Sequence, residues 1–320
     1  MKAAIRRKYC NPEGLAIESI PTPEPAPDQV LIKIHATTVS RTDCGVLTGL
    51  PHIFRLFIGL LSPRKIITGT DLTGEVVQAG SAIEKFCVGD KVWAFYDEGL
   101  CSHAQYVCLK ESDNLDMMPD EMTYEEAVAC MEGAHYAINF LDKVKLEQGQ
   151  SVVINGATGA IGTALVQLLN NGGFKVTAVC AAKHNSLVQS LGADATIDYT
   201  VDDVFDRAEK FDFVFDTIGN HSYGRWKKLL TDKGTFVSTE LGPYCQFLFL
   251  AISTTFFFSK KVIFPLPTDI MNSMRIVRQL IAEGKFRAVI DKTYPLDEIG
   301  DAFRYVIEGF KTGNVVVRIM

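Results

Sequence analysis

The chain lacks the cysteine spacing of a secreted, disulfide-bonded protein. Its 320 residues contain eight cysteines, which are dispersed and form no C-x-x-C pair. A disulfide framework would be denser than this, and reduced thiols fit a chain of this size better. We therefore expect a cytoplasmic protein with free cysteines.

The chain also lacks the features of nucleic-acid-binding, membrane-spanning and exported proteins. Its formal net charge is −6, and its lysines and arginines are scattered, so it has no basic field for nucleic acid. The two most apolar stretches, 52–61 and 247–258, are shorter than the ~20 residues that span a bilayer. The amino terminus has no long apolar core followed by a small-residue cleavage site. We expect no transmembrane segment and no signal peptide.

These two apolar stretches have two interpretations. Buried core or a subunit interface is the plainer one. Alternatively, they line or cover an apolar substrate pocket.

A glycine-rich loop in the middle of the chain indicates a phosphate site. Residues 151–155 resemble a buried strand and residues 163–169 continue as an apolar helix, so the loop lies where unpaired helix N–H groups point outward. Small residues there let a phosphate approach the backbone, although such a string also occurs in ordinary turns. The predicted pyrophosphate loop consists of Gly156, Ala157, Thr158, Gly159, Ala160, Ile161 and Gly162.

Strands and helices alternate after this loop. Apolar strands are predicted at 175–180, 195–198, 211–215 and 234–238, with a helix ending near 191–192. This alternation predicts a doubly wound parallel sheet. Ligands bind at the carboxyl edge of such sheets, which adds as cofactor-binding candidates Thr217, Ile218, Gly219, Ser238, Thr239 and Leu241.

The residues after the second of these strands favour one nicotinamide cofactor. An NAD site usually has an acid there for the ribose 2′-hydroxyl, whereas this chain has no acid from Cys180 until Asp194. Lys183 would attract a 2′-phosphate, although it could also be a solvated lysine at a helix start. We predict a preference for NADPH over NADH.

The remaining sequence is organised around this central region. Residues 1–123 contain short alternating strands typical of a β-rich domain. Two helices and a terminal strand at 314–319 follow residue 263, and we expect the last strand to rejoin the first domain.

Several motifs together resemble those of a known family. They are Gly69–Gly80, Val88–Val92, the glycine loop, Leu191–Asp194, Asp216–Gly219 and Gly313–Val317. The chain resembles the medium-chain dehydrogenase/reductase superfamily, in its zinc-free branch similar to quinone oxidoreductases. The resemblance implies an α/β fold with a GroES-like β-rich catalytic domain (1–123 and 270–320) and a Rossmann NADP(H)-binding domain (124–269). It also implies an active site between the domains and a homodimer, with 256–264 as the candidate interface.

The resemblance implies no catalytic zinc. Zinc-dependent members bind the metal through Cys, His and Cys, and the matching positions here are Ser40, Thr70 and Cys130. One thiolate cannot hold a tetrahedral zinc ion. Without a Lewis acid, a simple carbonyl is a harder hydride acceptor. A conjugated acceptor needs less help, so we expect a small apolar quinone or α,β-unsaturated carbonyl (alkenal or enone).

Other roles also come from the resemblance. Lys183 and Tyr199 match positions that approach the 2′-phosphate, and Asn314 matches a polar position near the cofactor. Thr42 matches the position of a relay hydroxyl in zinc-dependent relatives. The other candidate proton donors are His135, whose imidazole could titrate near neutral pH, and Tyr136 or Tyr96, whose hydroxyl could donate from the cleft. Glu132 is interpreted as a cap carboxylate.

Two alternatives stay open. A short-chain alcohol or carbonyl dehydrogenase would use Tyr223 and Lys227 as its Y-x-x-x-K pair, although that family places its glycines near the amino terminus. A non-catalytic NADPH-binding structural or regulatory protein is the other alternative.

Overall fold

The computed structural model describes residues 1–52, 55–257 and 259–320, with backbone alone at 244 and 255–257. It divides the chain into two compact units. The first unit comprises residues 1–132, 270–282 and 287–320, and the second comprises residues 133–269 and 283–286. Within the described residues, no helix is both long enough and apolar enough to cross a membrane.

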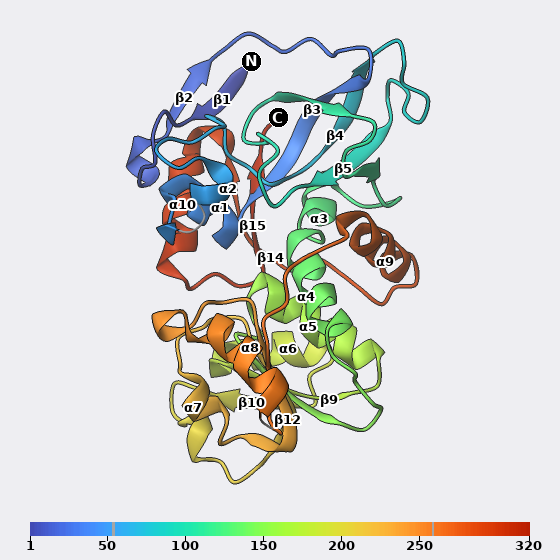
Figure 1. The fold of residues 1–320 in the computed structure, drawn as a ribbon. Coiled ribbons are helices and arrows are strands. Elements are labelled where there is room, and N and C mark those ends of the chain that lie inside the picture. Colours follow the sequence, from blue (N-terminus) through green and yellow to red (C-terminus); the bar gives the residue numbers. More distant parts are fainter. Residues whose placement is uncertain (53–54, 258) are drawn as a thin grey trace. The chain divides into compact units, whose positions relative to one another are not determined.

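The first unit is dominated by β-structure (Figure 1). Its strands are β1 (Lys2–Ile5), β2 (Ala16–Ser19), β3 (Gln29–Val39), β4 (Asp71–Ala79), β5 (Lys91–Phe95), β6 (Tyr106–Lys110), β7 (Leu115–Met117), β14 (Ile290–Pro295) and β15 (Asn314–Arg318). Its helices are α1 (Arg41–Thr48), α2 (Arg55–Ile58), α3 (Tyr124–Val128), α9 (Ile270–Ala282) and α10 (Ile299–Glu308).

The larger sheet of this unit has the strand order β14-β15-β3-β4-β5-β7, and β6 also pairs with β3. β15 runs antiparallel to β3, with Val316 opposite Thr38. The terminal strand therefore joins the sheet built by the first hundred residues, as the sequence predicts. The core beneath it is formed by alternate apolar residues of β3 and β4 and by α10, which presents Ala302, Phe303 and Val306.

A buried arginine closes the carboxyl end of α1. The last carbonyls of a helix have no intrahelical donor. Arg6, the residue after β1, donates from Nη1 to the carbonyls of Val46 and Leu47, the latter at 3.0 Å. The side chain of Arg6 is only 1% exposed, and burial lowers its pKa. Arg6 thereby ties the first strand to the helix that carries part of the site.

The second unit is a six-stranded parallel sheet in the order β10-β9-β8-β11-β12-β13. Its strands are β8 (Ser151–Asn155), β9 (Lys175–Cys180), β10 (Ala195–Asp198), β11 (Phe211–Asp216), β12 (Leu230–Ser238) and β13 (Lys261–Ile263). Its helices are α5 (Ala160–Asn171), α6 (Asn185–Ser190), α7 (Tyr223–Trp226), α8 (Gln246–Phe257) and α4 (Glu132–Asp142), whose first residue belongs to the first unit.

The chain begins at β8 in the middle of the sheet, adds β9 and β10 on one side, and then crosses to add β11, β12 and β13 on the other side. The strand order therefore reverses between β8 and β11, although all six strands are parallel. Right-handed crossovers place the helices that follow β8 and β9 on one face and those that follow β11 and β12 on the other. The middle of β8 is fully buried, with Val152, Val153 and Ile154 at 0% exposure, as expected for a central parallel strand. The predicted doubly wound sheet is confirmed.

The structure corrects part of the core interpretation of the two apolar stretches. In the first stretch, Leu56, Phe57, Leu60 and Leu61 are exposed, so this segment is not buried core. The second stretch forms α8, which buries Phe247 but exposes Phe249, Ile252 and other apolar side chains. Of the candidate interface at 256–264, residue 258 and the side chains of 256 and 257 lie outside the described part of the chain.

Candidate functional site

The glycine loop turns directly from β8 into α5. Gly156 has φ +79°, a left-handed conformation that favours glycine. The N–H of Gly159 donates to the carbonyl of Gly156 at 3.0 Å, which closes the turn. Gly159 is the N-cap of α5 and forms no side-chain cap, so the first N–H groups of the helix face a position without a capping side chain.

Glycine is required at the three positions of the loop for different physical reasons. A Cβ on Gly162 would lie 2.1 Å from the carbonyl oxygen of Gly156, and a Cβ on Gly156 would lie 2.5 Å from Oγ1 of Thr217. These two glycines allow the helix and strand to pack closely. A Cβ on Gly159 would meet nothing nearer than 3.5 Å. Gly159 therefore keeps open the space in front of the helix terminus, which is what a pyrophosphate requires.

A buried carboxylate organises the point where the strand order reverses. Asp216 is the last residue of β11, in register with Asn155 of β8. Its Oδ1 accepts hydrogen bonds from Nδ2 of Asn155 at 2.8 Å and from the N–H groups of Ile218 and Gly219 at 3.1 Å each. Burial raises the pKa of Asp216, and these hydrogen bonds oppose the shift. Thr217 donates to the carbonyl of Asn155 at 2.9 Å. The sequence analysis missed Asn155 and Asp216 as the groups that hold this edge.

β12 also contributes residues to this edge of the sheet. Ser238 is opposite Asp216 in register, is fully buried, and its Oγ accepts from the N–H of Glu240 at 3.1 Å. Thr239 and Leu241 follow it and are half-buried. The structure therefore brings the predicted residues after β8, β11 and β12 to one edge of the sheet.

Lys183 and Tyr199 lie after the neighbouring strands β9 and β10. Both side chains are exposed, and the strand ends Cys180 and Asp198 are paired in register. The sequence analysis overlooked Asp198. Its carboxylate accepts from the N–H and Oγ1 of Thr200, and these bonds lower its pKa. Tyr199 therefore follows directly in the chain a carboxylate whose pKa is lowered and whose Oδ1 is hydrogen bonded.

Asn314 is in the first unit, at the start of β15. Its Nδ2 donates to the carbonyls of Ala129 at 2.8 Å and Val289 at 3.1 Å. These bonds use both amide hydrogens to fix β15 to the chain before α4. The role that the structure shows for this residue is structural.

A cluster of buried polar groups occupies the first unit around α1. Asp43 is fully buried, and its Oδ2 accepts from the backbone N–H of Ser40 at 3.0 Å, from Oγ of Ser40 at 3.0 Å and from Oγ1 of Thr70 at 3.4 Å. Ser40 and Asp43 form a reciprocal capping box at the start of α1. Burial raises the pKa of Asp43 to about 6.

Glu132 belongs to the same cluster and is the first residue of α4. Its side chain is 7% exposed and forms hydrogen bonds with Thr42 and Ser40. Burial, followed by the charges of Asp43 and Asp71, raises the pKa of Glu132 to about 8. The interpretation of Glu132 as a cap carboxylate stays a prediction.

The raised pKa values in this cluster favour a protonated carboxyl. Ser40 bonds through its side chain to the carboxyls of both Asp43 and Glu132. Of these two carboxyls, Glu132 has the higher pKa, and it lies next to the half-buried hydroxyl of Thr42. The ammonium of Lys311 interacts with the same Glu132 carboxyl.

Asp71 is a third buried acid in this unit. Its Oδ1 accepts from the N–H of Thr38 at 2.7 Å, and its Oδ2 bonds to Oγ1 of Thr38 at 2.6 Å. Burial, followed by the charge of Asp43, raises the pKa of Asp71 to about 7. Asp71 is thus neutral in part at pH 7.

Two further proton-donor candidates, His135 and Tyr136, lie on α4, whereas the hydroxyl of Tyr96 donates to Oδ1 of Asp113 at 3.2 Å. His135 is 2% exposed, with Nδ2 of Asn139 3.3 Å from its Nδ1, and its ring is 5.6 Å from that of Tyr136. Burial lowers the pKa of His135 to about 4. The expectation that His135 titrates near neutral pH is therefore wrong.

The residues at the zinc-matching positions do not fit a zinc ion. Ser40 and Thr70 lie together, but their hydroxyls bond to Asp43. Cys130 is a buried thiol whose pKa is raised by burial. Across the part of the chain that the structure describes, no three or more His, Cys, Asp or Glu side chains form a group that could hold a metal ion.

Tyr223 is packed as a core residue. Its ring is 7% exposed and lies 5.8 Å from that of Phe236. Burial raises the pKa of Tyr223, whereas a tyrosine acid-base catalyst needs a lowered one. Lys227 follows α7 as its C-cap. This geometry does not favour the short-chain interpretation.

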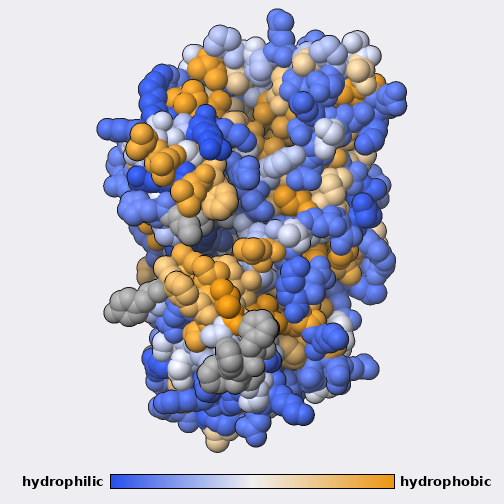
Figure 2. All heavy atoms as spheres, in the orientation of Figure 1, coloured by the Kyte–Doolittle hydropathy of each residue, from blue (hydrophilic) through white to orange (hydrophobic). Residues whose placement is uncertain are grey.

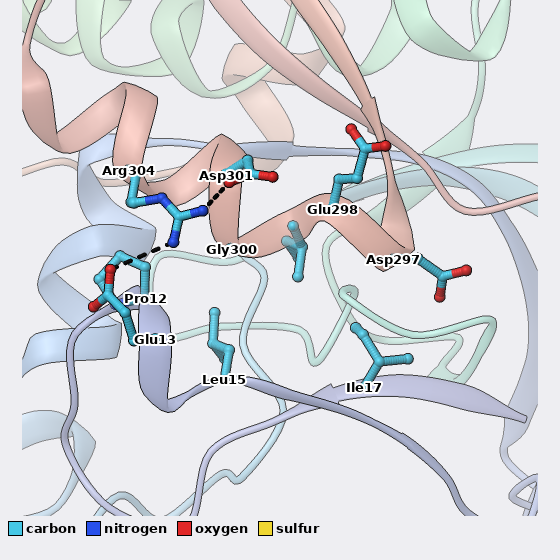
Figure 3. Close-up of a pocket in the computed structure, with 10 residues that line it drawn as sticks. Pro12, Glu13, Leu15, Ile17, Asp297, Glu298, Gly300, Asp301 and Arg304 are labelled. Atoms are coloured by element: carbon cyan, nitrogen blue, oxygen red, sulfur yellow. Dashed lines mark hydrogen bonds and ion pairs between the residues drawn. The ribbon is translucent and has the colours of Figure 1, made fainter.

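A surface hollow of about 240 Å³ lies elsewhere in the first unit (Figure 3). It is lined by residues 12–17 and by the start of α10, where Arg304 pairs with Glu13 and Asp301. It contains none of the predicted site residues.

Comparison with known proteins places this geometry in a family. Residues 26–138 match the family model described as alcohol dehydrogenase GroES-like domain, and residues 191–317 match the one described as zinc-binding dehydrogenase. The chain is 31% identical to the chloroplastic quinone-oxidoreductase homolog of Spinacia oleracea, over 95% of this chain and 94% of that protein. It is 29% identical to the chloroplastic NADPH-dependent alkenal/one oxidoreductase of Arabidopsis thaliana, over 99% of this chain and 79% of that protein.

Solved structures agree on the fold. The quinone oxidoreductase from Coxiella burnetii superposes with a TM-score of 0.86 at 23% identity, over 100% of this chain and 99% of that chain. A GroES-like domain with a Rossmann domain defines a class of two-domain oxidoreductases. The chain belongs to the medium-chain dehydrogenase/reductase superfamily, and it is an oxidoreductase. The predicted family and fold class are confirmed.

The pKa of Asp71 predicts a pH-dependent stability. A carboxyl whose pKa rises from 3.8 unfolded to about 7 folded stabilises fully below the unfolded pKa and loses that stabilisation as pH rises to the folded pKa. Relative to the native chain, Asp71→Asn should gain about 1 kcal/mol of unfolding free energy per pH unit from pH 4 to 7, and nothing above. Urea unfolding across this range measures the difference. Asp232→Asn on the surface is the control, and an equal gain there would contradict the assignment.

The loop geometry predicts opposite effects for two glycines. Gly159→Val should keep the melting temperature within about 2 °C and weaken pyridine-nucleotide binding at least tenfold, because only the space before α5 is filled. Gly162→Val should destabilise the second unit by more than about 2 kcal/mol, because its side chain meets backbone. Calorimetric melting and titration separate the two, and tight nucleotide binding by Gly159→Val would contradict the loop's role.

Proposed function

We propose that the chain is a zinc-independent, NADPH-dependent oxidoreductase that transfers hydride to a quinone or an α,β-unsaturated carbonyl. The observation that carries this proposal is that one chain has both an open glycine at the N-cap of α5 and hydroxyl side chains, Ser40 and Thr70, at two of the three positions that match zinc ligands. The names of the relatives, quinone-oxidoreductase homolog and NADPH-dependent alkenal/one oxidoreductase, support it.

The cofactor-binding residues fit a dinucleotide. The N–H groups at the start of α5 would hold the pyrophosphate, and Lys183 with Tyr199 would hold the 2′-phosphate. The residues that follow β11 and β12 would line the rest of the dinucleotide. When bound, the nicotinamide supplies the hydride; the protein contributes position and environment.

The first unit is suited to protonate the anion that forms when a conjugated acceptor takes up hydride. A conjugated acceptor spreads the incoming negative charge over its own π system and then needs a proton, not a Lewis acid. Glu132 holds a proton in the interior, and Thr42 links it to the half-buried surface of the cluster. We assign Glu132 as the proton reservoir and Thr42 as the relay hydroxyl.

The pKa values favour Glu132 with Thr42 as the proton source over His135, because burial lowers the pKa of His135 and leaves it without a proton to give at pH 7. The expected homodimer and cytoplasmic location remain part of the proposal and rest on the family resemblance and the cysteine usage.

Turnover tests the function and the proton route together. Stopped-flow oxidation of NADPH should occur with 9,10-phenanthrenequinone and with a 2-alkenal. Glu132→Gln should lower the maximal rate with the 2-alkenal by at least tenfold while leaving NADPH affinity unchanged, because glutamine keeps the hydrogen bonds without the acidic proton. Thr42→Val should act in the same direction.

Glu209→Gln, an exposed site in the second unit, is the control for this experiment. NADPH binding with no oxidation by any acceptor would instead support a non-catalytic binding protein. Unchanged alkenal reduction in Glu132→Gln would remove Glu132 from the reaction and leave the rest of the proposal standing.

Cofactor choice is tested at Lys183. Lys183→Gln should raise the dissociation constant for NADPH about tenfold, equivalent to about 1.4 kcal/mol, and leave that for NADH unchanged. Lys175→Gln, at the opposite end of β9, is the matched control because it removes the same charge at the other edge of the sheet. Equal loss for both nucleotides in Lys183→Gln would contradict 2′-phosphate recognition.

A further inference from the structure

The segment 55–66 of the first unit exposes large apolar side chains. Exposed fractions are 61% for Leu56, 62% for Phe57, 63% for Leu60 and 91% for Leu61, and Ile66 adds 47%. Figure 2 shows apolar side chains over the position of α2, bordered by hydrophilic ones. Contiguous exposed apolar surface of this kind marks a site of interaction.

The segment is held in this exposed conformation by its own hydrogen bonds. The N–H of Gly59 donates to the carbonyl of Arg55 at 3.0 Å, and the N–H of Arg64 donates to that of Ile58 at 2.9 Å. Gly59 has φ +125°, and a Cβ there would lie 2.0 Å from the carbonyl oxygen of Ser62. Tyr9 hydrogen-bonds the carbonyl of Gly59. The backbone therefore fixes residues 60 and 61 outward.

The charged residues within the segment are of one sign. Between Asp43 and Asp71 the sequence contains no acid, whereas Arg55, Arg64 and Lys65 lie within it, in a chain of net charge −6. These cations bond to backbone carbonyls: Arg55 to Gly49, Arg64 to Phe57 and Lys65 to Gly99. Among the described residues, none of the three is paired with a carboxylate. Among the residues that the structure describes, no ion pair therefore neutralises these three cations.

We infer that the segment 55–66 docks the protein on the surface of an anionic lipid bilayer. Apolar side chains flanked by cations are the pattern of an interfacial anchor, in which the apolar tips enter the acyl boundary and the cations meet lipid phosphates. A second copy of the chain is a poorer partner, because a two-fold interface would oppose the same three cations to themselves. The inference does not rest on the proposed function, because vesicle binding needs neither cofactor nor acceptor.

Co-sedimentation of the full chain with vesicles tests the inference. The chain should bind vesicles of phosphatidylcholine with phosphatidylglycerol and not vesicles of phosphatidylcholine alone. Combining Phe57→Ser, Leu60→Ser and Leu61→Ser should weaken binding at least tenfold. Arg64→Gln with Lys65→Gln should weaken it about fivefold per cation, and rising salt should do the same. Phe249→Ser with Ile252→Ser, exposed apolar residues of the second unit, is the matched control.

A second measurement keeps the test independent of folding. Leu61→Trp adds an indole at the most exposed apolar position, and its fluorescence should shift to the blue on anionic vesicles. No vesicle binding, equal binding by the triple serine variant, or no fluorescence shift would overturn the inference. A change of oligomeric state in the triple variant without vesicle binding would assign the segment to a second copy. A raised KM for the acceptor without vesicle binding would assign it to the substrate pocket.

Discussion

The buried carboxyl of Asp43 is the constraint on which the polar centre of the first unit depends. One oxygen of this side chain accepts bonds from Ser40 and Thr70, which stand in different elements. Because a buried carboxylate needs such partners, these hydroxyls cannot be exchanged freely for other groups. Burial of neighbouring carboxyls also raises their pKa values, and this favours a proton on the cluster. A buried carboxyl cluster that holds a proton thus stands where zinc-dependent relatives hold a metal ion.

The local features of the fold could be predicted from the sequence. The strands at 151–155 and 175–180 and the turn at Gly156 follow from apolar runs and from glycines whose conformations side chains would not allow. The carboxyl edge also follows, because parallel strands end at the same edge. Asp216 is one exception, since its partner Asn155 is 61 residues away in the sequence.

The proton-holding cluster could not be predicted in the same way. Asp43, Asp71 and Glu132 are far apart along the chain and become neighbours only through tertiary packing. Taken singly, each of these acids resembles a helix cap or a surface residue. Sequence periodicity marks buried apolar faces, and it does not mark the burial of an isolated carboxyl. The error on His135 has the same origin, because its pKa is set by burial that the sequence does not state. Asp198 ends a predicted strand, but the sequence alone does not show that it lies in register with Cys180 at the end of β9.

The two proposals meet in the chemistry of the acceptor. A quinone or enone that needs no Lewis acid is conjugated and apolar, and such molecules partition into lipid. A protein of net charge −6 is repelled by an anionic surface as a whole, so docking requires a local excess of positive charge with an apolar tip. The segment 55–66 supplies both from twelve consecutive residues, without a spanning helix. Docking would then raise the concentration of acceptor around the protein and leave the affinity of the protein for the acceptor unchanged. The effect of the segment on turnover is therefore separate from that of Thr42 and Glu132, which act on the proton.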